Sequence, residues 1–218
     1  MMLQNQGKGS GGMDRWDPVK EYIVDQNIET DIYGKWDDEI KEKYPKTIIK
    51  DYLLISPNDQ KLIYISDNKI KASYDVSTSK FGLGNLNDSF KTPIGLHIIV
   101  EKIGNEMPIF TIFKGRKPVG NNMTLNDLYE DKKIHDDHFK NHEDVITSRI
   151  LRLRGLEPNV NLGGNVDSYN RYIYIHGTAH EDQIGKKASH GCIRMRNKDI
   201  IELFSMCTID MHVIILDN

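Results

Sequence analysis

The chain has little of what several classes of protein require. Its two cysteines, Cys192 and Cys207, cannot build a disulfide framework and leave open only a single bridge. No apolar run approaches the roughly 20 residues that a membrane-spanning helix needs, so no transmembrane segment is predicted. Lys and Arg number 29 against 32 Asp and Glu, for a formal net charge of -3 with the signs mixed. This balance argues against the clustered basic surface of a nucleic-acid-binding protein.

The rest of the composition is that of an ordinary globular protein. Hydrophobic residues make up 38% of the 218 residues and charged residues 28%, which suits one domain with a real core plus an extension. Residues 1–13 lack the basic and apolar segments of a secretory signal, and their Gly- and Ser-rich composition predicts a disordered tail or a cloning remnant. Residues 14–46 predict a helical or irregular N-terminal extension.

From residue 48 onward, short apolar segments alternate with turn signals, which predicts a β-rich domain. The turn clusters Ser56-Pro57-Asn58-Asp59 and Asp67-Asn68 separate the first three segments, as in a β-meander. Strands are predicted at 52–55, 61–66, 69–76, 96–100, 109–113, 150–153, 172–176 and 211–216. The predicted fold class is mainly β with short helices, a β-rich α+β domain.

Two further segments complete the predicted domain. A polar insertion at about 115–148 interrupts the strands and favours a helix near 125–131. Near the end of the chain, Asn197 is predicted to be the N-cap of a helix that reaches about Met206. The buried side of that helix is predicted to consist of Ile200, Ile201, Leu203 and Phe204.

The chemistry of the chain is concentrated in one short segment, where His176, His190 and Cys192 each lie next to a glycine. A thiol beside an imidazole is the minimum requirement for cysteine nucleophilic catalysis. In the strand that ends at His176, alternation places Ile173 and Ile175 on the core face and His176 on the opposite face. Cys207 lies in an apolar context and is predicted to be a buried, inert thiol.

The string Ser189-His190-Gly191-Cys192-Ile193-Arg194, with His176-Gly177-Thr178 upstream, resembles the signature of the L,D-transpeptidases, the YkuD-type domain of bacterial cell-wall enzymes. Thirteen residues separate His176 from His190, a spacer of the expected size. The Lys91–Gly95 turn and the strand 170–175 fit the same family. The resemblance covers about residues 48–217 and implies a YkuD-type domain, sandwich-like or barrel-like, with the insertion at about 115–148.

The resemblance also implies a role for each residue of the site. Cys192 is expected to be the nucleophile and His176 its base, with the carbonyl of Gly177 orienting the imidazole in place of a carboxylate. His190 is expected to line the site. An oxyanion hole is expected from the backbone N–H groups of Gly191 and Cys192, with the Tyr174 hydroxyl as an additional donor. The substrate-binding residues are expected to be Arg194, Ser189 and Thr178.

The implied activity is acyl transfer on peptidoglycan stem peptides. Cys192 is expected to attack a tetrapeptide stem and release D-alanine, and the acyl group then passes from the Cys192 thioester to an amine of a second stem, which frees the thiol and gives a 3–3 cross-link. Attack by water makes the enzyme an L,D-carboxypeptidase, and attack by a free D-amino acid makes it an exchange enzyme. No metal or organic cofactor is expected, carbapenems are expected to acylate Cys192, and the expected location is the periplasm or cell envelope. The oligomeric state is left open.

Several alternatives stand beside this interpretation. His176, His190 and Cys192 could bind zinc, since thiolate and imidazole are both good zinc ligands, and a third class is a wall-peptide-binding module with an inactive site. His190 could be structural, Arg194 a surface ion-pair partner and Ser189 a turn former. The spacing of His135, His138 and His142 also suggests zinc, although a solvated insertion that covers the cleft is favoured.

Overall fold

The computed structural model describes residues 42–44, 50–119 and 145–218. The predictions for residues 1–13, for most of 14–46, for the helix near 125–131 and for His135, His138 and His142 lie outside the described residues. The described part consists mainly of strands, with one α-helix and two short 3₁₀ turns. This confirms the predicted fold class.

The N-terminal strands form the expected meander. They are β1 (Asp51–Ser56), β2 (Lys61–Ser66) and β3 (Lys69–Asp75), each antiparallel to the next. Asp67 and Asn68 both have positive φ, 50° and 57°, as the tight turn between two twisted strands requires. Short polar residues tolerate this conformation best after glycine, which explains why this dipeptide marks the turn.

The remaining strands extend this meander into a single sheet. They are β4 (Gly95–Ile103), β5 (Ile112–Lys114), β6 (Lys117–Pro118), β7 (Ile146–Gly155), β8 (Tyr174–Thr178), β9 (Ile193–Met195) and β10 (His212–Ile215). The ten strands follow the order β3-β2-β1-β10-β4-β7-β5-β6, and β8 pairs with both β7 and β9. The pairs β1–β10 and β8–β9 are parallel and the others antiparallel, so the sheet is mixed.

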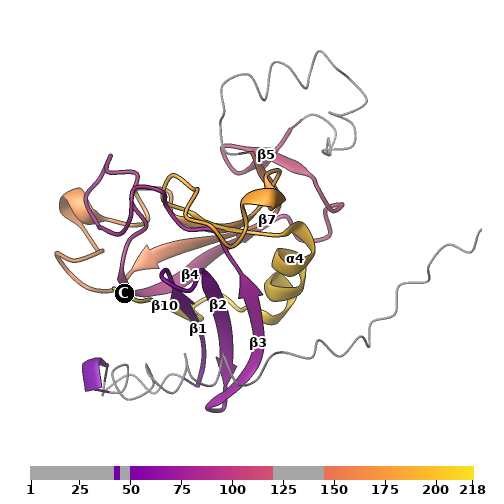
Figure 1. Cartoon of the computed structure of the whole chain (residues 1–218). Coiled ribbons are helices and arrows are strands. Elements are labelled where there is room, and N and C mark those ends of the chain that lie inside the picture. The colour runs from indigo at the N-terminus through magenta and orange to yellow at the C-terminus, as the bar shows by residue number, and fades with distance from the viewer. Residues whose placement is uncertain (1–41, 45–49, 120–144) are drawn as a thin grey trace, which may run out of the picture.

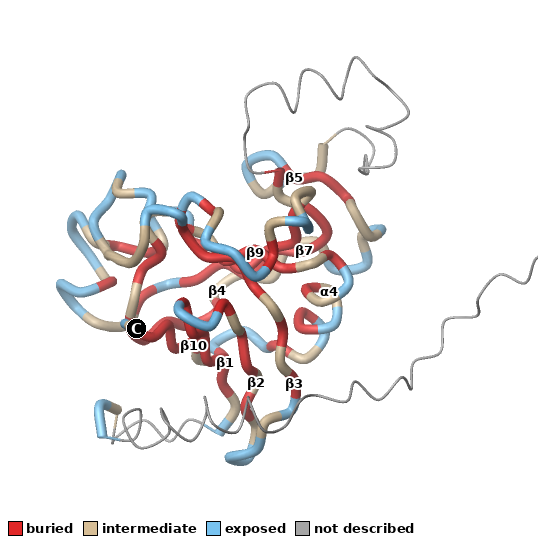
Figure 2. The backbone as a smooth tube through the Cα atoms, in the orientation of Figure 1, coloured by how far each residue is buried: buried red, intermediate tan, exposed pale blue. Residues whose placement is uncertain are grey.

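The sheet bends around its core. In Figure 1, β1, β2 and β3 run down the view while β4 and β7 cross it, and helix α4 (Asn197–Met206) lies beside them. The helix packs against β7 and β8. The largest cluster of buried side chains joins the meander, the central strands and the helix, and Figure 2 shows the strands as mostly buried and the connecting loops as exposed. Its fully buried members include Leu53, Leu62, Ile99, Leu151, Leu153, Ile175, Ile193, Leu203 and Val213.

Sequence patterns missed some boundaries. Strand β8 begins at Tyr174 instead of Tyr172, because Tyr172 has φ 56° and belongs to a turn. The short strands β6 and β9 were not predicted, since two or three residues carry no readable alternation. Helix α4 has Arg196 at the N-cap and begins at Asn197, so the predicted N-cap is wrong by one residue. Ile201 is only partly buried, unlike the other three apolar residues of the predicted face.

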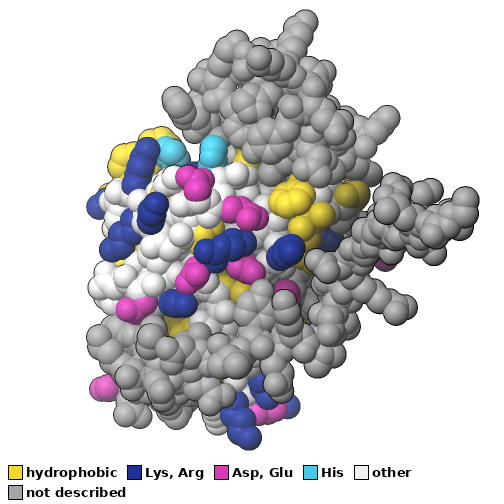
Figure 3. Space-filling view, turned by 45° about the vertical axis from the view of Figure 1, so that its right-hand side comes forward, with side chains coloured by type: hydrophobic (Ala, Val, Ile, Leu, Met, Phe, Trp, Pro, Cys, Tyr) yellow, Lys and Arg dark blue, Asp and Glu magenta, His cyan; other side chains and the backbone are white. Residues whose placement is uncertain are grey.

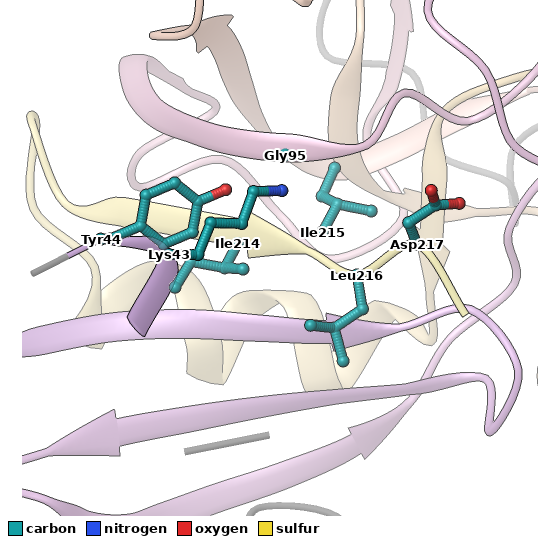
Figure 4. Close-up of a pocket in the computed structure, with 7 residues that line it drawn as sticks. All are labelled: Lys43, Tyr44, Gly95, Ile214, Ile215, Leu216 and Asp217. Carbon is teal, nitrogen blue, oxygen red and sulfur yellow. The ribbon is translucent and has the colours of Figure 1, made fainter. Parts of the chain in front are cut away.

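Residues 42–44, the described part of the N-terminal extension, lie at the C-terminal end of β10. The Tyr44 hydroxyl donates to a carboxylate oxygen of Glu157 at 3.3 Å, and burial, together with Glu157, raises the pKa of Tyr44. Lys43 and Tyr44 line a pocket with Ile214, Leu216 and their neighbours (Figure 4). None of the residues lining this pocket is among the predicted site residues.

Candidate active site

Strands β8 and β9 place two predicted site residues, His176 and Arg194, opposite each other on a common face. In their parallel register Ile175 lies opposite Ile193 and His176 opposite Arg194. Both isoleucines belong to the main core cluster, so the alternate residues of the two strands face the other way. Cys192 comes directly before β9 and packs against the cluster formed by Phe113, Ile150 and Tyr174. The thiol and the imidazole therefore lie on the same face of two adjacent strands.

The His176 imidazole is fully buried and held by its own strand. Its Nδ1 lies 2.8 Å from the carbonyl oxygen of Gly177. A carbonyl can only accept, so Nδ1 carries the proton and Nε2 is the basic nitrogen. A side chain at position 177 would place its Cβ 2.6 Å from the backbone oxygen of Thr147. This close approach requires glycine at 177, and it keeps the carbonyl in place.

The two cysteines lie in contrasting environments. Cys192 is partly exposed, and its thiol lies 3.4 Å from the carbonyl oxygen of Tyr172. Cys207 is buried, and this burial raises the pKa of its thiol to about 12. Both cysteines are free of disulfides. The structure thus confirms the prediction that Cys207 is buried. Because the thiolate is the reactive form of cysteine, the raised pKa makes Cys207 unreactive, and Cys192 is the accessible thiol.

The turn that precedes Cys192 is fixed by hydrogen bonds of Ser189. The Ser189 hydroxyl donates to the carbonyl of Cys192 at 2.6 Å and accepts from the N–H of Gly191 at 3.3 Å. Gly191 has φ 123°, and a Cβ there would lie 3.3 Å from the carbonyl oxygen of Lys91. Ser189 therefore shapes the turn, as its alternative interpretation expected. The Gly191 N–H is engaged in this state, and its role in an oxyanion hole stays a prediction.

His190 is exposed and lies among aromatic rings. Its ring centroid is 5.8 Å from that of Phe81 and 6.2 Å from that of Phe90. Phe81 and Phe90 are themselves about half exposed, at 47% and 55%. The imidazole thus belongs to a surface aromatic cluster beside the thiol, which is compatible with the expectation that it lines the site.

Arg194 and Thr178, both predicted to bind substrate, are buried. Arg194 is 4% exposed, and its backbone N–H and C=O both bond to Ser77. This burial excludes the alternative that Arg194 is a surface ion-pair partner. Thr178 is fully buried; its hydroxyl accepts from the N–H of His180 at 3.1 Å and its carbonyl accepts from the Asn197 amide at 2.9 Å. The substrate-binding roles of both residues stay predictions.

Sequence reasoning missed the contribution of Asn197 to the site. Its Oδ1 accepts from the hydroxyls of Thr147 and Ser148, each at 2.6 Å, and its Nδ2 donates to Thr178 and to Glu181. This buried network ties helix α4 to the end of β8, next to Gly177. The sequence indicated only a helix start, because Asn at such a position ordinarily caps the helix.

Three residues around the thiol were also missed. Arg116 donates to the Tyr174 hydroxyl at 3.2 Å, and its guanidinium carbon lies 5.5 Å from the ring centroid of Tyr172. Arg171 donates to the carbonyls of Gly84, Asn85 and Lys91, so it holds the loop that approaches Gly191. Burial lowers the pKa of Arg171, and the nearby Cys192 offsets only part of this shift. Arg116 carries no local sequence signal because it lies far along the chain from Arg171 and Tyr172, which directly precede β8.

The distribution of surface charge and of possible metal ligands bears on the composition-based prediction and on the zinc alternative. On the face shown in Figure 3, Lys and Arg are interspersed with Asp and Glu, in line with the balanced composition. Among residues 42–44, 50–119 and 145–218, no three His, Cys, Asp or Glu side chains gather as a metal site. The zinc alternative for His176, His190 and Cys192 therefore gains no support. No helix in the described part of the chain is long and apolar enough to cross a membrane.

An accessible cysteine directly before β9 and a carbonyl-oriented histidine on the adjacent strand β8 form a candidate site with the two groups that cysteine nucleophilic catalysis requires. The chain belongs to the L,D-transpeptidase catalytic domain family, YkuD, whose family model matches residues 50–215. The predicted family is thereby confirmed.

Individual relatives match over shorter stretches. The candidate L,D-transpeptidase YqjB of Bacillus subtilis is 42% identical over 48 residues, which cover 22% of this chain and 27% of YqjB. The candidate L,D-transpeptidase YkuD of the same organism is 47% identical over 51 residues, covering 21% of this chain and 31% of YkuD. The matched stretches thus span less than a third of either relative.

Solved structures of named L,D-transpeptidases are similar to this chain over most of its length. The enzyme from Xylanimonas cellulosilytica has a TM-score of 0.46 and 14% identity, covering 79% of this chain and 63% of that chain. The enzyme from Mycobacterium smegmatis has a TM-score of 0.43 and 15% identity, covering 77% of this chain and 58% of that chain. With TM-scores under 0.5, neither similarity bears on the details of the site.

Proposed function

We propose that this protein is a peptidoglycan L,D-transpeptidase that works in the cell envelope through a thioester on Cys192. The observation that carries the proposal is the shared face of β8 and β9, where an accessible thiol accompanies an imidazole oriented by the Gly177 carbonyl. Family membership supplies the reaction class and the substrate class.

In the first half-reaction, Nε2 of His176 takes the thiol proton and Sγ attacks the carbonyl carbon of the stem residue that precedes the terminal D-alanine. The tetrahedral oxyanion is stabilised by N–H groups of the 191–192 turn and by the Tyr174 hydroxyl. Because Tyr174 accepts a hydrogen bond from Arg116, its own O–H proton can point elsewhere. The C–N bond then breaks, and the amine of D-alanine leaves with the proton from His176.

In the second half-reaction, an amine of another stem attacks the thioester, and His176 takes its proton and returns one to the sulfur. The product is a 3–3 cross-link. If water or a free D-amino acid takes the place of that amine, the same site acts as an L,D-carboxypeptidase or an exchange enzyme. Water exclusion at the acceptor side decides between these outcomes.

The direct test compares Cys192→Ala with Cys207→Ala, a matched variant that removes the other thiol. On tetrapeptide-bearing wall fragments analysed by chromatography, we expect no turnover from Cys192→Ala and retained turnover from Cys207→Ala. Dimers, tripeptides or exchanged stems in the wild-type reaction identify the acceptor. Turnover by a folded Cys192→Ala protein would refute the proposal.

The same variants test acylation by β-lactams. An L,D-transpeptidase, LdtMt1, has been solved in complex with imipenem, and L,D-transpeptidase 3 of Mycobacterium tuberculosis with a faropenem-derived adduct. We propose that a carbapenem likewise acylates Cys192 here. Intact-mass spectrometry should show one adduct on the wild type and on Cys207→Ala, and none on Cys192→Ala.

A further inference from the structure

Arg116 occupies an unusual backbone position close to the thiol. The register of β5 and β6 pairs Lys114 with Lys117, so Gly115 and Arg116 form a two-residue hairpin turn. Their φ angles are 55° and 67°, the left-handed conformation that such turns require at both positions. Glycine or asparagine is the usual choice at the second position, and a long side chain held there points to a use for that side chain.

The guanidinium of Arg116 interacts with Tyr174 and Tyr172, two tyrosines near Cys192. Its Nη1 donates to the hydroxyl of Tyr174, and Cys192 packs against the cluster that contains Tyr174. Its Cζ lies 5.5 Å from the ring centroid of Tyr172, whose carbonyl oxygen is 3.4 Å from the Cys192 sulfur. Tyr174 and Tyr172 therefore hold the Arg116 guanidinium at the edge of the candidate site, near the Cys192 sulfur.

The other arginines around Tyr172 are already committed to protein groups. Arg152 is buried and pairs with Glu101 at 2.6 Å, with its guanidinium over the Tyr169 ring. Arg171 is engaged with three backbone carbonyls.

Arg116, in contrast, has N–H groups that make no hydrogen bond to the described residues. Its Nε is 3.9 Å from Glu101, too far for a hydrogen bond, and its side chain is 32% exposed. Within residues 50–119 and 145–218, its Nη2 makes no hydrogen bond. Glu101 lies closer to Arg152 than to Arg116, at 2.6 Å against 3.9 Å, so within the described residues its ion pair with Arg116 is the weaker of the two.

We propose that Arg116 binds a carboxylate of the donor stem and so determines which stems are accepted. The inference rests on the proposed function. A planar guanidinium binds a carboxylate through two parallel hydrogen bonds, and stem peptides offer two carboxylates near the reacting carbonyl. One belongs to the terminal D-alanine and the other to the distal centre of the diamino acid.

The experiment measures kcat and KM of wild type, Arg116→Gln and Arg116→Lys on three donors. The first is a tetrapeptide stem with both carboxylates, the second carries D-alaninamide at its end, and the third has lysine in place of the diamino diacid. On the first donor we expect Arg116→Gln to lower kcat/KM by about 10- to 100-fold, chiefly through KM. Arg116→Lys should fall between, because an ammonium retains the charge but not the fork.

The two modified donors identify the carboxylate. On the donor that lacks the recognised carboxylate, wild type should fall to the level of Arg116→Gln, and the effect of the substitution should vanish. An equal loss on all three donors, or no loss on any, overturns the inference.

Two control variants separate binding from charge and folding. Lys117→Gln removes an exposed charge from the same hairpin and should change kcat/KM by less than about threefold. Arg116→Gly relieves the left-handed strain, so its thermal midpoint should not fall while its kcat/KM matches that of Arg116→Gln. A Lys117→Gln loss as large as that of Arg116→Gln would reduce the effect to general charge and overturn the inference. If wild type converts none of the donors, the proposed function itself fails and the inference falls with it.

Discussion

The carbonyl oxygen of Gly177 accepts a hydrogen bond from Nδ1 of His176 and so helps to orient the imidazole. An ordinary catalytic triad uses a carboxylate for this purpose, which also stabilises the charged imidazolium. A neutral carbonyl fixes the tautomer but offers less electrostatic stabilisation, so precise placement of the strand matters more. The glycine makes this placement possible because a side chain at 177 would collide with the backbone of Thr147.

We expect Gly177→Ala to reduce kcat by about 100-fold or more, because a displacement of about 1 Å at a catalytic group is enough for such a loss. The added Cβ would lie 2.6 Å from the Thr147 backbone oxygen, so β7 or β8 must shift. Steady-state kinetics on the tetrapeptide donor provide the measurement. Gly163→Ala is the control, since nothing lies within 4 Å of its Cβ and only its positive φ is strained. A folded Gly177→Ala enzyme with wild-type kcat would contradict this role.

At the scale of elements, the site depends on the junction between α4, β7 and β8. Strand β7 shifts register between Thr147 and Ile150, where Ser148 has φ 62°. This bulge turns the Thr147 and Ser148 hydroxyls onto Asn197, which begins α4. One buried amide thus joins three elements beside Gly177.

We expect Asn197→Ala to lower the free energy of unfolding by about 2–4 kcal/mol, because it leaves several buried polar groups without partners. It should also lower kcat, since the end of β8 loses its attachment to α4. Urea unfolding and steady-state kinetics measure the two effects.

Two further variants define the role of the Asn197 amide. Asn197→Asp should be at least as damaging near neutral pH, because it replaces the Nδ2 donor with a carboxylate facing Glu181. Asn165→Ala, on an exposed side chain, should change little. Wild-type stability of Asn197→Ala would show that the network does not hold the junction.

At the scale of the whole molecule, the buried His97 of β4 links folding to pH. His97 is fully buried between the Gly95 carbonyl and the Ser168 hydroxyl, each 3.0 Å away. Burial lowers the pKa of His97 to about 4 from 6.5. Below pH 6.5 the imidazole of His97 is therefore protonated in the unfolded chain, whereas in the folded protein it stays neutral down to about pH 4. As the pH drops through this range, the free energy of unfolding falls.

We expect His97 to remove about 2 kcal/mol of stability between pH 7 and pH 5. Asp199 acts in the opposite direction, because burial raises its pKa to about 6 and the folded protein takes up that proton first. The test is therefore the difference between wild type and His97→Gln in urea unfolding at several pH values. His212→Gln serves as a control on a half-buried histidine, whose pKa is lowered by burial. A pH-independent difference between wild type and His97→Gln would contradict the linkage.

The sequence by itself determined the meander, the C-terminal helix, the family and the segment that holds the chemistry. These features depend on local patterns: the alternation of apolar residues in β1–β3, the Asp67-Asn68 turn and the His-Gly-Cys string. The core-facing Ile175 of β8 could also be predicted, because alternation fixes a face, and the apolar context of Cys207 predicted its burial.

Only the tertiary structure decided which distant residues surround the thiol. Sheet pairing, a hairpin turn and a helix junction together bring Arg116, Tyr172 and Asn197 to the site. None of these long-range contacts leaves a periodic trace in the sequence. Arg194 was predicted to bind substrate and is buried, with its backbone paired to Ser77 just beyond the end of β3. Local energetics select strands and turns, whereas the closure of the sheet brings separate segments together, and that closure creates the site.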